Sequence, residues 1–186
     1  MPGAPATTTV RSMGGTYMLN RDISDSMEAL MKMQGVGWMV RQAVKYSNVT
    51  TVITQSTSET GHVKLHSVMQ STGGVKNEET WVLDGVEREK ENWIWGKVKG
   101  NVKYIKISEL EDEFLKEGWA QDCIDANGGE GELIASEQFS LSDTWTAYQV
   151  IGFADVNGER RQVRKVVGKK GDQVERVRMI HDWREE

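Results

Sequence analysis

The chain has 186 residues, of which 38% are apolar, and this composition is typical of one folded globular domain and not of a disordered chain. Its net charge of −5 argues against a nucleic-acid-binding protein, which normally carries a basic face. Cys123 is the only cysteine, which excludes a disulfide within the chain, and no run of about 18 apolar residues could span a membrane.

The N-terminal segment, residues 1–13, has no apolar stretch of the kind found in secretory signals. We expect it to form a disordered tail. The lone cysteine fits a reducing compartment, so we predict a cytoplasmic protein. The residues that follow, GGTYML at 14–19, have the pattern of a first strand.

Two short amphipathic helices are predicted over residues 24–47. Asp25 and Glu28 have the spacing of a capping box, and apolar residues then recur at helical intervals until Gly35-Val36-Gly37 breaks the run. A stripe of methionines and aromatic residues at this spacing packs into a core in most proteins. Alternatively it forms a lid over a cavity, because methionine side chains adapt to varied apolar shapes.

The chain beyond residue 48 has the pattern of short β-strands separated by turns. Apolar and polar residues alternate over residues 62–70, and Trp93 and Trp95 share one face of a later run. Asn157-Gly158 is a strong signal for a two-residue hairpin, since both positions tolerate positive φ. Strands at this spacing favour an antiparallel sandwich or barrel.

An acidic insertion, residues 107–140, interrupts the strands. The segment from Glu109 to Glu137 contains ten acidic residues and one lysine, which gives a local charge of −9. Residues 108–119 have a capping-box spacing and an apolar edge, which predict a helix, and residues 125–132 are predicted to form a flexible loop. We expect a solvated surface segment or, alternatively, a second cover over the mouth of a barrel.

Both ends of the chain resemble the intracellular lipid-binding proteins, the family of the fatty-acid-binding proteins. The N-terminal match is GTYMLN followed by SDSMEALMKMQGVGWMVRQA, and the C-terminal match is NGERRQVRKVV followed by VERVRMI. The resemblance implies an all-β fold, an up-and-down antiparallel β-barrel of about ten strands capped by a helix-turn-helix. It makes residues 14–186 a single barrel domain, with residues 24–47 as the helical lid over a ligand cavity.

The resemblance also implies a polar anchor inside the barrel. By position, Lys165 (or Arg164, if the register shifts by one residue) and Arg176 match basic residues that hold a ligand carboxylate in the family, and Arg178 replaces a tyrosine. Buried cations require an anionic or strongly polar partner. The alternative is that this face is solvated and the basic residues are ordinary surface. The apolar part of the site is expected to include Met27, Met31, Trp38, Trp93 and Trp95.

Two functions fit these features. The first is a soluble carrier that binds a hydrophobic small molecule resembling a fatty acid, polyketide or terpenoid. The second is a cofactor-independent cyclase or isomerase of secondary metabolism that uses the cavity as its active site. No catalytic motif is present, so we expect no cofactor, no metal and no nucleic-acid partner, and His62, His66 and His181 are expected at the surface. A barrel filled by its own side chains is a third, weaker possibility.

Overall fold

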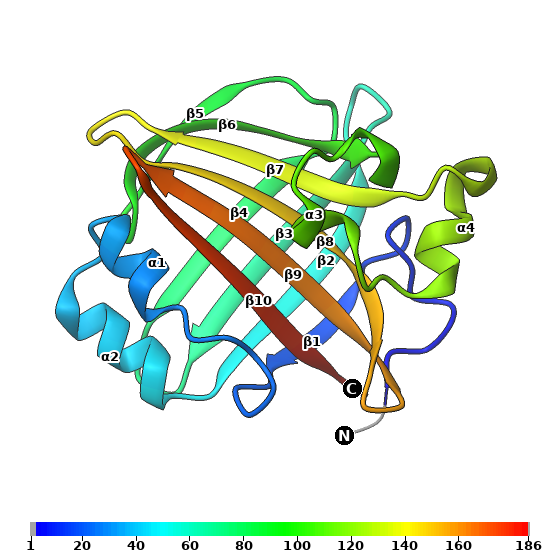
Figure 1. The fold of residues 1–186 in the computed structure, drawn as a ribbon, viewed down its shortest axis with the longest axis horizontal. Helices are drawn as coiled ribbons and strands as arrows, with labels where there is room; N and C mark the ends of the chain where they lie inside the picture. The colour runs from blue at the N-terminus through cyan, green and yellow to red at the C-terminus, as the bar shows by residue number, and fades with distance from the viewer. Residues whose placement is uncertain (1–2, 186) are drawn as a thin grey trace.

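The computed structural model describes residues 3–185, which contain ten strands and several short helices (Figure 1). The strands are β1 (Gly15–Leu19), β2 (Val49–Thr57), β3 (Val63–Ser71), β4 (Lys76–Val82), β5 (Arg88–Asn92), β6 (Gly96–Ile105), β7 (Leu133–Ser140), β8 (Thr146–Val156), β9 (Glu159–Lys170) and β10 (Gln173–Arg184). The helices are α1 (Glu28–Met33), α2 (Trp38–Tyr46), the 3-10 turn η1 (Ile107–Glu109), α3 (Glu113–Lys116) and α4 (Gln121–Gly129). No helix among the described residues is long and apolar enough to cross a bilayer.

All ten strands form one antiparallel sheet, in the order β4-β3-β2-β1-β10-β9-β8-β7-β6-β5. Every pairing joins strands adjacent in sequence, except that β1 also pairs with β10 and so joins the first strand to the last. The sheet curls around a central space (Figure 1). Its edge strands, β4 and β5, are bridged by side chains: Lys90 Nζ lies 3.2 Å from Glu79 Oε1. The predicted antiparallel barrel with helices after its first strand is confirmed.

Side chains alternate between the interior and the outer wall of the barrel, as they must on pleated strands. On β9 the even-numbered residues Arg164 and Val166 face the interior, and on β10 the odd-numbered residues Met179 and His181 do so. The register agrees, because Arg164 lies directly opposite Met179. This parity decides which of the basic residues near the C-terminus can meet a ligand.

The two helices between β1 and β2 lie at one end of the barrel (Figure 1). Gly35 makes the break between them with φ of +77°, a conformation that glycine adopts without strain. Another glycine, Gly168 on β9, lets α1 approach the wall: a Cβ there would lie 2.4 Å from Leu30 Cδ1. The predicted capping box does not form, because the Asp25 carboxylate instead accepts a hydrogen bond from the Arg178 backbone N–H, at 2.7 Å.

The N-terminal segment differs from the expected disordered tail. Met1 and Pro2 lie outside the described residues, but residues 3–13 run along the end of the barrel opposite α1 and α2 (Figure 1). Met13 is fully buried, and its carbonyl accepts a hydrogen bond from Tyr17 Oη at 2.9 Å. Burial of apolar side chains in this segment offsets the entropy cost of ordering it.

The acidic insertion covers the outer wall of the barrel and not its mouth. Apolar residues from α3, α4 and the turn between them are buried against outward-facing residues of β7–β9: Leu115, Trp119, Ala120 and Cys123 on the insertion, and Ala135, Val150 and Val163 on the strands. Trp119 lies against Gly152, where a Cβ would come within 3.0 Å of its ring. The insertion therefore closes a second apolar layer outside the sheet.

The secondary structure of the insertion also departs from the prediction. Residues 108–119 do not form one helix; they are divided between η1 and the single turn α3, with Asp112 capping α3 by accepting from Phe114 N–H at 3.0 Å. The expected flexible loop begins inside α4, whose helical conformation ends before Ala126. The strand β7 starts at Leu133, so the inserted segment is shorter than the expected 107–140.

Candidate functional site

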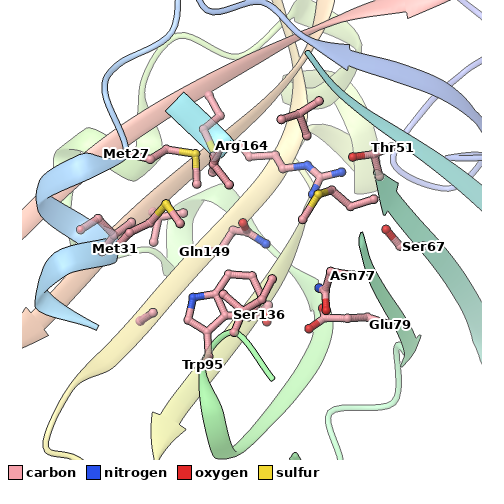
Figure 2. Close-up of a pocket in the computed structure, with 18 of the residues that line it drawn as sticks. Met27, Met31, Thr51, Ser67, Asn77, Glu79, Trp95, Ser136, Gln149 and Arg164 are labelled. Carbon is pink, nitrogen blue, oxygen red and sulfur yellow. The ribbon is translucent and has the colours of Figure 1, made fainter. Parts of the chain in front are cut away.

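A cavity of about 180 Å³ lies inside the barrel beneath α1 (Figure 2). Most of its wall is apolar: Leu19, Met27, Leu30, Met31, Val44, Val49, Met69, Trp81, Ile94, Trp95, Ala147, Val166 and Met179. The barrel is therefore not filled by its own side chains. Polar groups are set among these residues: Thr51, Ser67, Asn77, Glu79, Ser136, Gln138, Gln149, Arg164 and His181.

The mouth of the cavity is closed from two sides. Met27, directly before α1, and Met31 on α1 lie on one side, and Trp95 comes from the turn between β5 and β6 on the other side (Figure 2). Met31 and Ile94 belong to one buried apolar cluster, against which Trp95 packs. A molecule entering here must separate flexible methionine and aromatic side chains, which can repack around varied apolar shapes.

Arg164 supplies a positive charge inside the cavity. Its guanidinium projects from β9 toward Thr51 on the opposite wall (Figure 2), and its Nε donates to Gln162 Oε1 at 3.0 Å. Within residues 3–185 no carboxylate lies close enough to form an ion pair with it. Burial lowers the pKa of Arg164 to about 10, while Tyr17 and Glu79 oppose that shift, so the side chain remains charged at neutral pH.

His181 lies beside this charge as a neutral imidazole. Burial, and then the nearby Arg164 guanidinium, lower the pKa of His181 well below its usual value of about 6.5. Its Nδ1 is buried without a hydrogen-bond partner among the described residues, as is Nε2 of Gln162, the residue opposite it in the β9–β10 register. Buried polar atoms without partners are rare, so Arg164 and His181, which line the cavity, are suited to receive a polar group of a ligand, while Gln162 is buried beside them outside the cavity wall.

Glu79, across the cavity, is neutralised by its surroundings. Its carboxylate accepts hydrogen bonds from the Trp81 indole N–H at 3.0 Å and from the Lys90 ammonium at 3.2 Å. Asn92 on β5 reaches Asn77 on β4 at 2.6 Å beside this pair. These contacts join the two edge strands, and they leave Arg164 as the unpaired charge facing the cavity.

Some of the predicted site residues line the cavity. Met27, Met31 and Trp95 are in its wall, and so is Arg164, which the sequence offered as the alternative to Lys165. Whether they bind a ligand stays a prediction. His181 was expected at the surface and is instead buried in the interior.

Lys165 does not reach the cavity. It points outward beneath α3, where its ammonium donates to the carbonyls of Phe114 and Glu117 and lies 4.8 Å from the centre of the Trp119 ring. Burial, with a smaller contribution from the charge of Arg178, lowers the pKa of Lys165 to about 8. Its role is to hold the insertion on the outer wall, since carbonyls at a helix C-terminus favour a cation.

The prediction that Arg176 and Arg178 face the interior is wrong. Arg176 is exposed on the outer wall and forms an ion pair with Asp112 at 2.8 Å, and Arg178 is exposed nearby. The reason is strand parity, because Val177 and Met179 occupy the interior face of β10 and leave the even-numbered residues outside.

Two predicted tryptophans also lie outside the site. Trp38 is 66% exposed at the start of α2, and Met39, expected to face the mouth, is 77% exposed beside it. Trp93 is 62% exposed, with its indole N–H donating to the Lys76 carbonyl at 3.0 Å. The predicted apolar face of α2 contained Trp38 and Met39, but the residues that pack against the buried cluster are Val40 and Val44.

The buried neutral state of His181 has a consequence for stability. In the unfolded chain this histidine binds a proton below about pH 6.5, whereas in the folded protein it stays neutral to a lower pH, so folding stability falls as the pH drops below 6.5. Replacing His181 by Phe removes this loss. Between pH 7 and pH 5 the free energy of unfolding of His181→Phe is expected to gain up to about 2 kcal/mol relative to the wild type.

Urea unfolding at several pH values measures this difference. The control is His62→Phe, the same replacement at an exposed position outside the cavity. Equal pH dependence of the wild type and His181→Phe would show that His181 titrates normally in the folded protein.

The chain is similar to known proteins in sequence and in fold. No family model matches the chain. The chain is 26% identical over 185 residues to pericyclase pydY of Acremonium sp., covering 96% of this chain and 95% of the relative. It is 24% identical over 187 residues to probable pericyclase scpY of Mollisia scopiformis, covering 98% and 95%.

Among solved structures, the chain is similar to the Schistosoma mansoni fatty-acid-binding protein in complex with arachidonic acid. The TM-score is 0.54 at 18% identity, and the match covers 92% of this chain and 95% of that chain. The chain therefore has the fold of the fatty-acid-binding proteins, and the resemblance inferred from its two ends is confirmed at the level of the fold.

Proposed function

We propose that the protein is a cofactor-independent cyclase that closes a ring in an unsaturated, largely apolar substrate by an intramolecular pericyclic reaction. The observation that carries this proposal is the unpaired guanidinium of Arg164 beside the neutral His181, inside an apolar cavity. Support also comes from two relatives, similar over nearly the whole chain, that are named a pericyclase and a probable pericyclase.

The reaction we assign is a [4+2] cycloaddition between a conjugated diene and an alkene that bears a carbonyl group. Two C–C σ bonds form between the ends of the diene and the alkene, and three π bonds are replaced by one. No atom leaves and no proton is transferred, so the site needs no general acid or base. It needs to hold the chain folded with its reacting carbons in contact and to withdraw electron density through the carbonyl.

The cavity residues can meet both needs. Arg164 and His181 would bind the carbonyl oxygen, whose negative charge grows as the alkene accepts electrons from the diene, and charge-assisted hydrogen bonds strengthen with that charge. Met27, Met31 and Trp95 would pack on the folded hydrocarbon chain and exclude water. These roles follow from placement in the cavity wall and are part of the proposal.

A carbocation cyclisation fits the cavity less well. Such a reaction places positive charge on the substrate, and the Arg164 guanidinium has no carboxylate partner within the described residues to offset the repulsion. The one carboxylate in the cavity wall, Glu79, is already paired with Lys90. A neutral, concerted ring closure avoids this repulsion.

The second candidate function is that of a carrier. The same cavity and the same polar cluster would hold an apolar molecule with a carboxylate, and the fold is that of the fatty-acid-binding proteins. A carrier and a cyclase differ in one measurable respect: both bind, but only the cyclase lowers the barrier to reaction. A cytoplasmic location, inferred from the single cysteine, stays a prediction for either function.

A linear trienone, in which three methylene groups separate a conjugated diene from an enone, tests the proposal. We expect the protein to accelerate its ring closure over the rate in buffer, with saturation at high trienone concentration and no dependence on pH between about 7 and 9, where His181 stays neutral and Arg164 charged. Ring closure followed by ultraviolet absorbance measures the rate. Saturable binding of the trienone with no acceleration would support the carrier and contradict the cyclase.

A further inference from the structure

The barrel wall has no backbone hydrogen bonds where the two edges of its sheet meet. Strands β4 and β5 share no backbone ladder, and the side-chain bridges between them, from Lys90 to Glu79 and from Asn92 to Asn77, lie toward the lid end. Farther from the lid the edges bound a shallow groove of about 50 Å³. Its walls include Trp81, Val82, Val86, Gly100, Val102 and Gln138. We call this depression the side groove.

The side groove and the cavity share walls. Trp81, Ser136 and Gln138 line both, so the two spaces are separated by side chains and not by a hydrogen-bonded strand. Trp81 is held by its indole N–H, which donates to Glu79. The spaces can therefore join through side-chain movement alone, because no backbone hydrogen bond between β4 and β5 must break.

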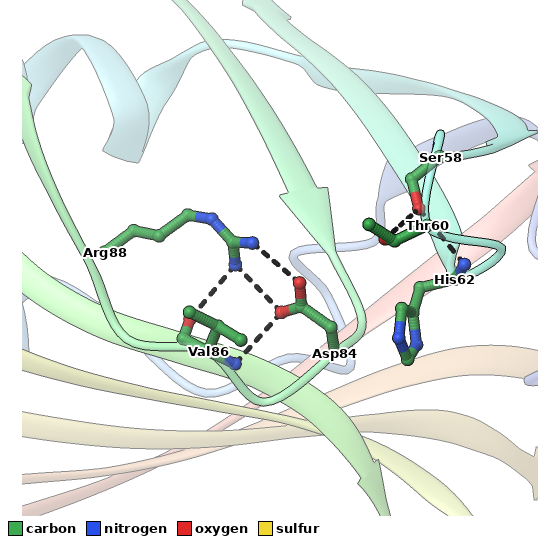
Figure 3. A network of polar contacts seen from close by, with 6 residues as sticks. All are labelled: Ser58, Thr60, His62, Asp84, Val86 and Arg88. Atoms are coloured by element: carbon green, nitrogen blue, oxygen red, sulfur yellow. Dashed lines mark hydrogen bonds and ion pairs between the residues drawn. The ribbon is translucent and has the colours of Figure 1, made fainter.

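Three charged residues line the side groove, Arg88, Lys90 and Glu137, and the two cations are paired. Lys90 is bound to Glu79, and Arg88 donates to both carboxylate oxygens of Asp84, at 2.8 and 2.6 Å. Asp84 also accepts from the Val86 backbone N–H at 2.9 Å, which fixes the loop between β4 and β5 (Figure 3). Val86 is 53% exposed in this fixed loop. The groove thus presents apolar surface that an apolar chain could cover.

The cavity alone is too small for a long ligand, so a long ligand needs additional space beside it. At about 180 Å³ it is smaller than the roughly 300–1,000 Å³ typical of pockets that bury a drug-sized ligand. A second depression adjoins the cavity under the lid, but charged side chains line it, among them Arg21, Asp25 and Lys45. An apolar chain gains less there, because the charged groups must give up water.

We propose that the side groove is a second binding site, which takes the apolar tail of the substrate whose reacting part occupies the cavity. The site selects long-chain substrates that carry a polar head near Arg164, and Trp81 separates head from tail. This inference rests on the proposed use of the cavity as a ligand site, but it does not require that the ligand react.

Displacement of the fluorescent polyene cis-parinaric acid by straight-chain fatty acids tests the side groove. In Val86→Trp the larger side chain fills the groove from an exposed loop position, so the fold is expected to remain intact. Octadecanoate is expected to bind this variant about tenfold more weakly than it binds the wild type, because about two methylene groups remain in water. The affinity for decanoate is expected to stay within about twofold of the wild-type value. The matched control is Val174→Trp, also at an exposed valine, on β10; it should change neither.

Photolabelling locates the tail directly. Octadecanoate with a diazirine on its last carbon is expected to label peptides containing Val86 or Val102 in the wild type and to lose this label in Val86→Trp. Labelling confined to α1 and α2, or equal weakening of decanoate and octadecanoate, would overturn the side groove while leaving the cavity in place. Failure of every fatty acid and of cis-parinaric acid to bind would overturn both the groove and the cavity as a ligand site.

Discussion

Replacing Arg164 by methionine is expected to lower kcat/KM for ring closure of the trienone by about 10- to 100-fold, since hydrogen bonds to a charged group contribute roughly 1.5–3 kcal/mol and 1.4 kcal/mol is tenfold. Most of the loss should lie in kcat. The carbonyl oxygen of the bound trienone is nearly neutral, and it gains charge only as the bonds form, so the guanidinium acts more strongly on the transition state than on the bound substrate.

The same substitution is expected to raise the melting temperature of the ligand-free protein. Arg164 is enclosed by the barrel without a carboxylate partner, and methionine keeps much of the apolar stem while removing the desolvated charge. Arg178→Met is the matched control, because Arg178 is exposed on the outer wall, and neither turnover nor melting temperature should change appreciably. Equal kcat/KM for the wild type and Arg164→Met would show that Arg164 does not stabilise the transition state.

Replacing Trp119 by alanine is expected to destabilise the protein by about 3–5 kcal/mol, the range for truncating a buried aromatic side chain to alanine. The Trp119 side chain is 6% exposed, lies against Gly152 and donates its indole N–H to the Leu115 carbonyl at 2.9 Å. It also faces the Lys165 ammonium, so its loss weakens the contact that anchors α3. Urea unfolding measures the change.

The Trp119→Ala variant distinguishes a role of the insertion in stability from a role in turnover. Because Trp119 is outside the barrel, kcat/KM per folded molecule is expected to stay within about twofold of the wild type, given that sites without shared partners act independently. Trp38→Ala, at an exposed position, is expected to change stability by less than about 0.5 kcal/mol. A stable Trp119→Ala with impaired turnover would instead place the insertion at the active site.

The barrel could be predicted because its evidence is local. Gly35-Val36-Gly37 marks the break between the lid helices, and Asn157-Gly158 makes the β8–β9 turn with φ of +53° and +80°. The acidic insertion could not be predicted in the same way. Its charge indicated a solvated segment, and only the tertiary structure shows that its few apolar residues, Trp119 among them, face outward-pointing apolar residues of the sheet.

Which basic residues line the cavity depends on which face of β9 and β10 points inward, and a shift of one residue in the sequence assignment reverses that face. Counting from Arg176 placed the even-numbered residues of β10 inside, whereas Val177 and Met179 are the interior residues, and His181 follows them by the same alternation. A signal was present: two apolar residues precede His181 at alternate positions. The pairing of Arg164 with Met179 is a contact between strands, which no short stretch of sequence contains.

The stereochemistry of the ring-closed product tests the central claim most directly. The linear trienone is achiral, so closure in buffer gives both mirror-image forms of each product equally, whereas closure inside a chiral cavity gives one form in excess. We expect chiral chromatography to show one enantiomer in excess with the wild type, and this excess to fall toward zero with Arg164→Met as the uncatalysed reaction takes over. A racemic product formed at the buffer rate, with the trienone demonstrably bound, would contradict the claim that this cavity is an active site.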